Sequence, residues 1–251
     1  MRPGAFAMFD ALGFKGVWER AARATPPWDV LGKLEGLVRD SNDVQGAAES
    51  AMATLEAAGT VVRTEIKTLF LSDTIVVGCW ADSPKNPFAA MWTALMTVCG
   101  TAGNILARAA QAPGPTFAYR GCISYGEFDM RSTFIMGPAV DLAAESADWA
   151  QAGLVWLHPT AKRLVESHVQ HAAGDLIRPW RVPLKDGQHV QTFVVSPYVG
   201  VQPVSWVDLR NAIMGTFEGA KKEDVIAKAR NTSAFLDAEL ARLQAPPAIP
   251  A

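Results

Sequence analysis

The apolar and polar residues of this chain follow two spacings, one typical of β-strands and the other of helices. Short runs of alternating or continuous apolar residues predict strands, and longer stretches with apolar residues every three or four positions predict helices. Gly, Pro and Ser-Asp pairs separate these segments. The predicted strands cover residues 5–9, 61–71, 74–80, 117–128, 133–136, 153–157 and a hairpin over 181–195. The predicted helices cover residues 13–24, 28–58, 87–111, 137–149, 160–169, 205–218 and 221–243.

The order of the predicted elements indicates the fold class. The first seven run β-α-α-β-β-α-β, which predicts a layered α/β domain of the α+β type, with a mainly antiparallel sheet flanked by helices. We expect this domain to occupy residues 1–200, followed by a helical extension over 201–244. The Pro- and Ala-rich residues 245–251 are expected to form a disordered tail.

Composition narrows the class of protein. The 251 residues are 49% hydrophobic, enough for a full core, and 23 Lys and Arg against 25 Asp and Glu give a net charge of -2. We therefore expect neither nucleic acid nor an anionic membrane as a partner. The longest uninterrupted apolar run, Ile75 to Ala81, is far shorter than the roughly 20 residues of a membrane span, and the N-terminal residues lack the apolar h-region of a signal peptide. A soluble, cytoplasmic protein is the expectation.

The cysteines and histidines do not suggest a transition-metal site. Cys79, Cys99 and Cys122 lie inside apolar runs without metal-type spacing, which is typical of buried free thiols in a reducing compartment. His168 and His171 share a predicted helix, but no third ligand is near them in sequence. We therefore do not expect zinc.

Two aspartates at strand ends are the strongest chemical signal. Asp10 follows the first apolar run and precedes Leu-Gly-Phe at a predicted helix start, where free backbone N–H groups bind phosphates. Asp73 occupies the turn of a predicted hairpin, which can hold a second carboxylate facing the first. Two hard oxygen ligands beside an anion-binding helix start suit Mg²⁺ or Mn²⁺ carrying a nucleoside triphosphate. The simpler alternatives are a helix cap for Asp10 and a turn residue for Asp73.

Five ordered motifs then carry a resemblance to class III nucleotidyl cyclases. They are Phe9-Asp10-x-x-Gly13-Phe14, Ser72-Asp73, Arg120-Gly-Cys-Ile-Ser-Tyr-Gly126, Gly137-Pro-Ala-Val-Asp-Leu-Ala143 and Leu184-Lys185-x-Gly187-x-x-x-Gln-Thr192-Phe193. They span residues 5–196 approximately, and their shared order is more specific than any one of them. The resemblance implies a ferredoxin-like catalytic domain that pairs head to tail as a homodimer, with composite active sites built by both subunits.

The resemblance also implies roles for individual residues. Asp10 and Asp73 would bind two divalent metal ions, with the Ala11 carbonyl as an additional ligand. The backbone N–H groups of a short stretch would bind the triphosphate, and its residues are Leu12, Gly13 and Phe14.

Two cations complete the implied phosphate site. Arg120 would bind the phosphates from the metal-bearing subunit and Lys185 from its partner. Bidentate hydrogen bonds from the arginine and the point charge of the lysine suit a leaving pyrophosphate. The structural alternatives are a surface strand residue pairing with Glu127 for Arg120, and a turn residue beside Asp186 for Lys185.

The chain departs from the purine cyclases at four positions. Leu69 and Phe134 stand where family members read the purine with polar side chains, and neither can form a side-chain hydrogen bond. The family's ribose-orienting Asn and its transition-state Arg are replaced by Asp141 and Glu145. Two explanations compete: an inactive cyclase-like module that binds or dimerises, or an active branch with another base and a rebuilt site. The chain retains the two metal-binding carboxylates and the two phosphate-binding cations that the resemblance implies, and this favours the active branch. These residues are Asp10, Asp73, Arg120 and Lys185.

Among divergent cyclases, the pattern is similar to the pyrimidine cyclases of bacterial Pycsar anti-phage systems. That resemblance implies a stand-alone enzyme whose cyclic nucleotide activates a separate effector protein. Apolar Leu69 and Phe134 would narrow the pocket toward a pyrimidine, with UTP favoured and cytidylate or purine cyclisation as alternatives. Backbone amides, Thr68, Ser132 and Thr133 are candidate contacts to the base.

Overall fold

The computed structural model describes residues 1–12, 32, 36, 62–111, 116–131, 134–167, 175–202 and 205–245. The helices predicted over residues 13–24 and 28–58 lie outside the described residues, apart from Gly32 and Gly36, both of which are helical. Nearly all of the predicted tail lies outside them too, as do Gly13, Phe14, Ser132 and Thr133 of the candidate site.

The described elements follow the predicted order. The strands are β1 (Arg2–Ala11), β2 (Arg63–Leu71), β3 (Thr74–Asp82), β4 (Tyr119–Arg131), β5 (Phe134–Met136), β6 (Val155–Leu157), β7 (Ile177–Pro183) and β8 (His189–Val195). The helices are α3 (Pro87–Gln111), α4 (Pro138–Ala147), α5 (Pro159–Glu166), α6 (Trp206–Gly215) and α7 (Glu223–Gln244). Every predicted strand and helix within the described residues is therefore present, with shifts at some ends.

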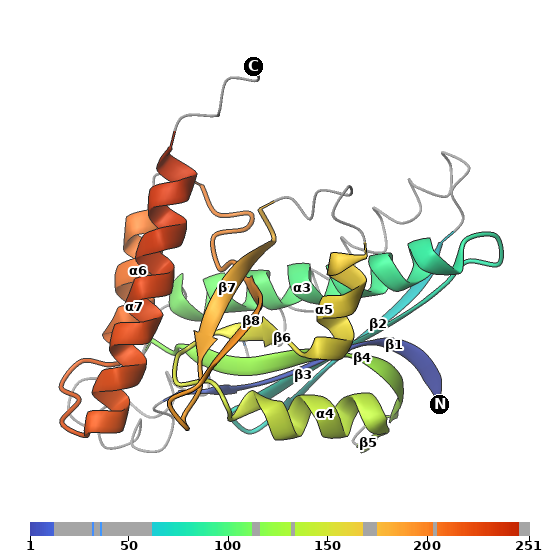
Figure 1. Ribbon diagram of the computed structural model, residues 1–251, viewed down its shortest axis with the longest axis horizontal. Coiled ribbons are helices and arrows are strands. Elements are labelled where there is room, and N and C mark those ends of the chain that lie inside the picture. Colours follow the sequence, from blue (N-terminus) through green and yellow to red (C-terminus); the bar gives the residue numbers. More distant parts are fainter. Residues whose placement is uncertain are drawn as a thin grey trace.

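One sheet contains all of the described strands. Its order is β2-β3-β1-β4-β6-β8-β7, and β5 pairs with β4 beside this path (Figure 1). Neighbouring strands are antiparallel except β4 and β6, which run parallel. The predicted α/β fold with a mainly antiparallel sheet is confirmed, and its central pair, β1 and β4, carries the first candidate residues.

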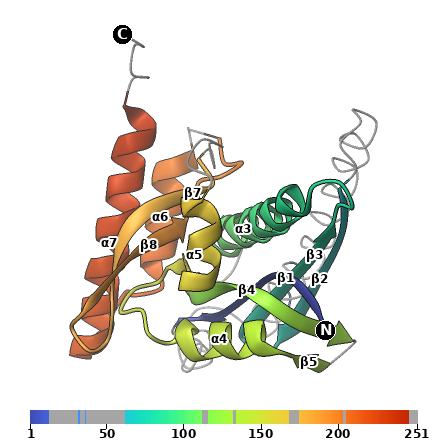
Figure 2. The same cartoon turned by 45° about the vertical axis from the view of Figure 1, so that its right-hand side comes forward.

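Helices cover both faces of this sheet. Figures 1 and 2 show α3 and α5 on one side and α4 on the other. Successive side chains of a strand point to opposite faces, so Phe9 joins a buried cluster with Leu95 of α3. Phe6 joins a second cluster with Val140 of α4. Asp10 has the same parity as Phe6, and it therefore lies on the face that α4 covers.

Helix α3 is the buried centre of the other face. Among the described residues, it is the one helix long and apolar enough to cross a bilayer, and 56% of its most apolar window is buried inside the protein. Its Leu95, Val98 and Ile105 pack in the same cluster as the sheet residues Phe9 and Ile123. Its hydropathy is thus explained by burial against the sheet, as in the core helix of a layered domain.

The three cysteines also belong to the interior. Cys79, Cys99 and Cys122 are buried and unbridged, which confirms their prediction as buried free thiols. Burial raises the pKa of each thiol, to about 12 for Cys79, so these side chains stay protonated near neutral pH.

The C-terminal helices pack on the end of the sheet that holds β7 and β8 (Figure 1). Leu209 of α6 and Phe235 of α7 share a buried cluster with Trp156 and Val182 of the sheet. Leu12, directly after β1, belongs to the same cluster. The predicted extension therefore shares a hydrophobic core with the sheet domain.

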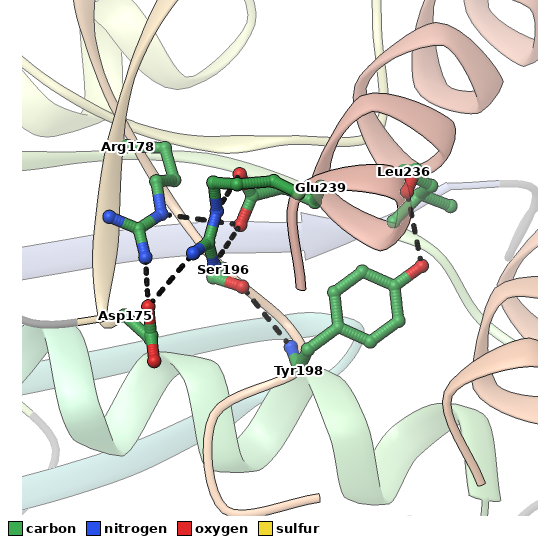
Figure 3. A network of polar contacts seen from close by, with 7 residues as sticks. Asp175, Arg178, Ser196, Tyr198, Leu236 and Glu239 are labelled. Atoms are coloured by element: carbon green, nitrogen blue, oxygen red, sulfur yellow. Dashed lines mark hydrogen bonds and ion pairs between the residues drawn. The ribbon is translucent and has the colours of Figure 1, made fainter. Parts of the chain in front are cut away.

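A polar network fixes α7 to this core (Figure 3). Asp175 pairs with Arg178 and, at 3.0 Å, with Arg242 of α7. The buried Glu239 carboxylate lies 3.6 Å from the Arg178 guanidinium. The Tyr198 hydroxyl donates to the backbone carbonyl of Leu236 at 3.3 Å. These contacts anchor the middle and end of α7, while Asp224 and Asn231 in its first half form hydrogen bonds with Gln151 in the loop after α4.

Candidate active site

Asp10 and Arg120 form the centre of the candidate site. They lie opposite each other in the antiparallel register of β1 and β4, which brings their side chains together on the α4 face. The Arg120 Nη2 atom is 3.5 Å from Asp10 Oδ2. Only 8% of the Arg120 side chain is exposed, so it is not the surface residue that pairing with Glu127 would require. That structural alternative is wrong.

The turn between β2 and β3 brings Asp73 to the end of β1. Ser72 has a φ of 62°, which makes the tight hairpin turn. The Ala11 N–H donates to the Asp73 carbonyl oxygen at 3.0 Å and ties this turn to the strand that carries Asp10. The charge of Asp73 adds to the field that raises the pKa of Asp10. The two predicted carboxylates are therefore neighbours.

Asp148 is a charged residue of this site that sequence reasoning missed. It follows the last residue of α4, and its carboxylate forms ion pairs with both Arg120 and Lys185. Its carbonyl oxygen also accepts a hydrogen bond from Arg120 Nη1 at 3.4 Å. The charged side chains form a chain in which signs alternate: Asp10, Arg120, Asp148 and Lys185.

The carboxylates of Asp10 and Asp148 have different electrostatic environments. Burial raises the pKa of Asp10 above its ordinary value; Arg120 opposes the shift, and the charges of Asp148 and Asp73 add to it. For Asp148, partial burial acts in the same direction, but the hydrogen bond from Lys185 and the charge of Arg120 lower its pKa overall. Asp10 is thus a carboxylate whose negative charge is incompletely compensated, whereas that of Asp148 is well compensated.

This imbalance fits a bound cation. The described residues contain no group of three or more His, Cys, Asp or Glu arranged as a metal site. Asp10 and Asp73 instead provide two carboxylates, and a neighbouring backbone carbonyl at Ala11 can add a third oxygen. Hard divalent cations such as Mg²⁺ take this ligand type and often bind through only one or two carboxylates plus substrate phosphates. A bound cation would also supply the positive charge needed to compensate the Asp10 carboxylate.

The raised pKa leads to a prediction for the metal-free protein. Asp10 binds its proton more tightly in the folded protein than in the unfolded chain. The stabilisation from this proton is therefore complete below the pKa of the unfolded chain, and it is lost as pH rises through the pKa of the folded protein. At neutral pH, Asp10→Asn should therefore raise the melting temperature, and the difference should shrink below about pH 4. Thermal unfolding across pH measures this. Mn²⁺ should stabilise the parent and not the variant; equal stabilisation of both would contradict the metal assignment.

Leu12 and Thr68 do not have the environments that their predicted roles need. The Leu12 N–H donates to the Ala118 carbonyl at 2.7 Å, so it is already engaged and is not free for a triphosphate. Thr68 has the parity of Ile66 and Phe70, which pack toward α3, whereas Leu69 packs with the α4-side cluster. Thr68 therefore lies on the opposite face from Asp10, and its role as a base contact is corrected.

The predicted base and ribose residues lie along β5 and α4. Phe134 is 77% exposed, an unusual environment for a large apolar side chain, and Asp141 and Glu145 are exposed as well. Glu145 is close enough to His158 for its charge to oppose the lowering of the His158 pKa, which burial causes. No described contact connects these three residues with Asp10 in the single chain.

Comparisons with known proteins identify the fold. No protein-family model and no curated protein matches the chain. An adenylate cyclase of Trypanosoma brucei in its monomeric state is 9% identical, with 80% of this chain and 91% of that chain covered, at a TM-score of 0.51. A non-canonical dimeric guanylyl cyclase domain of the RhoGC fusion protein from the aquatic fungus Blastocladiella emersonii is 12% identical (78% and 96% covered, TM-score 0.49). The adenylyl cyclase CyaB of P. aeruginosa is 14% identical (78% and 94% covered, TM-score 0.46).

The chain therefore has the fold of a nucleotidyl cyclase catalytic domain, and at these identities the likeness shows the fold alone. The matched fold is a mainly antiparallel sheet with helices on both faces, as described above.

Proposed function

We propose that this protein is a nucleotidyl cyclase that converts a pyrimidine nucleoside triphosphate, UTP before CTP, into the 3′,5′-cyclic monophosphate and pyrophosphate. The observation that carries the proposal is the convergence of Asp10, Asp73 and Arg120 at the end of β1. Two carboxylates suited to a cation lie beside a buried arginine suited to phosphate, on a fold shared with cyclases. An inactive module would not require this combination.

The proposed reaction is an in-line displacement at phosphorus. The ribose 3′-oxygen forms a bond to the α-phosphorus while the bond from that phosphorus to the bridging oxygen of pyrophosphate breaks. The 3′-hydroxyl loses its proton to solvent, and negative charge grows on the departing pyrophosphate. Two divalent cations held by Asp10, Asp73 and the Ala11 carbonyl would supply acidification of the hydroxyl and charge neutralisation at the triphosphate.

The chain's own side chains position the phosphates. Arg120 is fixed by its burial in the sheet, and its planar guanidinium can donate two parallel hydrogen bonds to phosphate oxygens. Lys185, on the turn between β7 and β8, adds a point charge to the leaving pyrophosphate. Asp10 must be ionised for this arrangement, which its raised pKa opposes until a cation binds. Gly13 and Phe14 remain the proposed backbone donors to the triphosphate.

Base selection is proposed to depend on Leu69 and Phe134. Leu69 packs against the α4-side cluster, and Phe134 presents an exposed ring on β5. An apolar wall discriminates mainly by size, by roughly 1–3 kcal/mol per misfit group. We therefore propose preference for the smaller pyrimidine rings, with some cyclisation of other nucleotides. Backbone amides, Ser132 and Thr133 stay candidates for contacts to the base.

The proposed cellular role follows from the resemblance to Pycsar cyclases. A cytoplasmic homodimer would make cyclic UMP during phage infection, and the product would activate a separate effector protein. Dimeric and monomeric cyclase domains both occur among the solved structures of this fold.

Pyrophosphate release from each nucleoside triphosphate separately tests the proposed activity. With Mn²⁺, the protein should release pyrophosphate from UTP fastest, together with an equal amount of a 3′,5′-cyclic product. Asp73→Ala serves as the control for a contaminating enzyme. Release from none of the four nucleotides would contradict catalysis and favour a cyclase-like dimerisation module.

A further inference from the structure

Asp148 occupies the place of an anion in the candidate site. Its carboxylate pairs with Arg120 through one oxygen and with Lys185 through the other. Arg120 and Lys185 are the two cations proposed above to hold phosphate oxygens. A carboxylate and a phosphate offer these donors the same kind of charged oxygen acceptor. Asp148 therefore forms the contacts that a bound polyphosphate needs.

The three partners differ in freedom to move. The Arg120 side chain is buried in the sheet, whereas 62% of the Asp148 side chain is exposed. Asp148 also lies beyond the last helical residue of α4, and Lys185 lies in the turn before β8. A cavity of about 450 Å³ adjoins both residues and is lined also by Trp149, Leu184, Asp186 and Gln188. Arg120 does not line this cavity, so the structure pairs a fixed, buried arginine with an exposed carboxylate that has space to withdraw from it.

We propose that Asp148 is a displaceable counter-ion, which pairs with Arg120 and Lys185 between turnovers and is replaced on both by the phosphates of substrate or product. This inference rests on the proposed function for the identity of the anion. Without Asp148, the buried Arg120 would keep only Asp10, at 3.5 Å, as an anionic partner among the described residues, and Asp10 is the proposed cation ligand; Asp148 therefore keeps Arg120 paired between turnovers. A polyphosphate carries more negative charge than one carboxylate and can take over both cations.

The consequence is that Asp148 weakens the binding of polyphosphates and assists the release of pyrophosphate. Each binding event breaks two ion pairs, and each release restores them. Lys185 could instead act on a phosphate held by the other subunit. The exchange is then the same, because Asp148 must still release both Arg120 and Lys185 of its own chain. Asp148 is a positioning residue in this scheme and makes no contact with reacting atoms.

The test is pyrophosphate binding by calorimetry, without nucleotide and without divalent metal. Asp148→Asn keeps the shape of the side chain and removes its charge, and it should bind pyrophosphate roughly tenfold tighter than the parent. Asp186→Asn is the matched control, because Asp186 adjoins Lys185 in sequence and its carboxylate accepts from the Gln188 N–H. This control should stay within about twofold of the parent. Asp148→Glu retains the charge and should resemble the parent.

The outcomes separate this inference from the proposed function. Unchanged or weaker pyrophosphate binding in Asp148→Asn, with the fold intact by circular dichroism, would overturn the displacement model and leave Asp148 as a structural ion-pair partner. An equal gain in Asp186→Asn would also overturn it, since general charge would then explain the effect. Because no turnover is required, the result stands even if the protein cyclises no nucleotide. If it does, pyrophosphate inhibition should tighten by the same factor in Asp148→Asn.

Discussion

Replacing Asp73 by alanine is expected to lower turnover by at least about a hundredfold while the protein stays folded. Asp73 lies in the β2–β3 turn, and its backbone carbonyl accepts a hydrogen bond from the Ala11 N–H at the end of β1. Without Asp73, the site keeps only one of the two side chains proposed to hold the cations. Those cations would compensate the negative charge that develops on the phosphates. Asp10→Ala should have a similar effect, because the two residues would share one metal pair.

The measurement is kcat/KM for pyrophosphate release, with Asp82→Ala as the matched control. Asp82 is an exposed aspartate at the far end of the same hairpin, in register with Arg63. Its replacement should leave turnover unchanged. Activity of Asp73→Ala within tenfold of the parent, a loss below about 1.4 kcal/mol of transition-state stabilisation, would contradict the assignment of this carboxylate.

Mixing two inactive variants should restore activity if the active site is shared between subunits. Asp73→Ala lacks a metal ligand and Lys185→Ala lacks a phosphate contact. After random exchange about half of the dimers are mixed, and each mixed dimer has one intact composite site, so about a quarter of parental activity should return. The exposure of Phe134, Asp141 and Glu145 in the single chain supports this expectation, since residues that serve another copy's site lie on the surface.

The control for this experiment is the double variant that carries both substitutions in one chain. Mixed with the parent, it forms dimers in which both deficient residues are on one subunit, and no composite site is then complete. Subunit exchange must be shown independently, for example with differently tagged chains. If exchange occurs and Asp73→Ala with Lys185→Ala recovers nothing, Lys185 acts on its own chain's site, where Asp148 already connects it to Arg120.

Local sequence rules were sufficient for the strands and turn that carry the two aspartates. Apolar continuity predicted β2 and β3, and Ser72-Asp73 predicted their turn, which the structure forms with Ser72 in the left-handed region. Helix α3 matches its predicted bounds, because its period is regular and Pro87 stands at a favoured first position. The prediction for β7 was too short: it begins at Ile177, and Pro179 is tolerated because β7 is an edge strand.

The row of ion-paired side chains around Arg120 could not be predicted in the same way. Asp148 follows a helix end, Lys185 lies in a hairpin turn and Arg120 is in a central strand, so only the tertiary fold brings them together. No motif marks Asp148 in the sequence. The engaged Leu12 N–H and the inward parity of Thr68 likewise depend on strand register, which composition and spacing do not specify.

We propose that this fold, with its paired carboxylates and buried arginine, cyclises a pyrimidine nucleotide. The most direct measurement is the mass-spectrometric identity of the products after incubation with equimolar ATP, GTP, CTP and UTP and Mn²⁺. We expect 3′,5′-cyclic UMP as the main product, with less cyclic CMP. Cyclic AMP or cyclic GMP as the main product would contradict the pyrimidine assignment, and the absence of any cyclic nucleotide would contradict the cyclase itself.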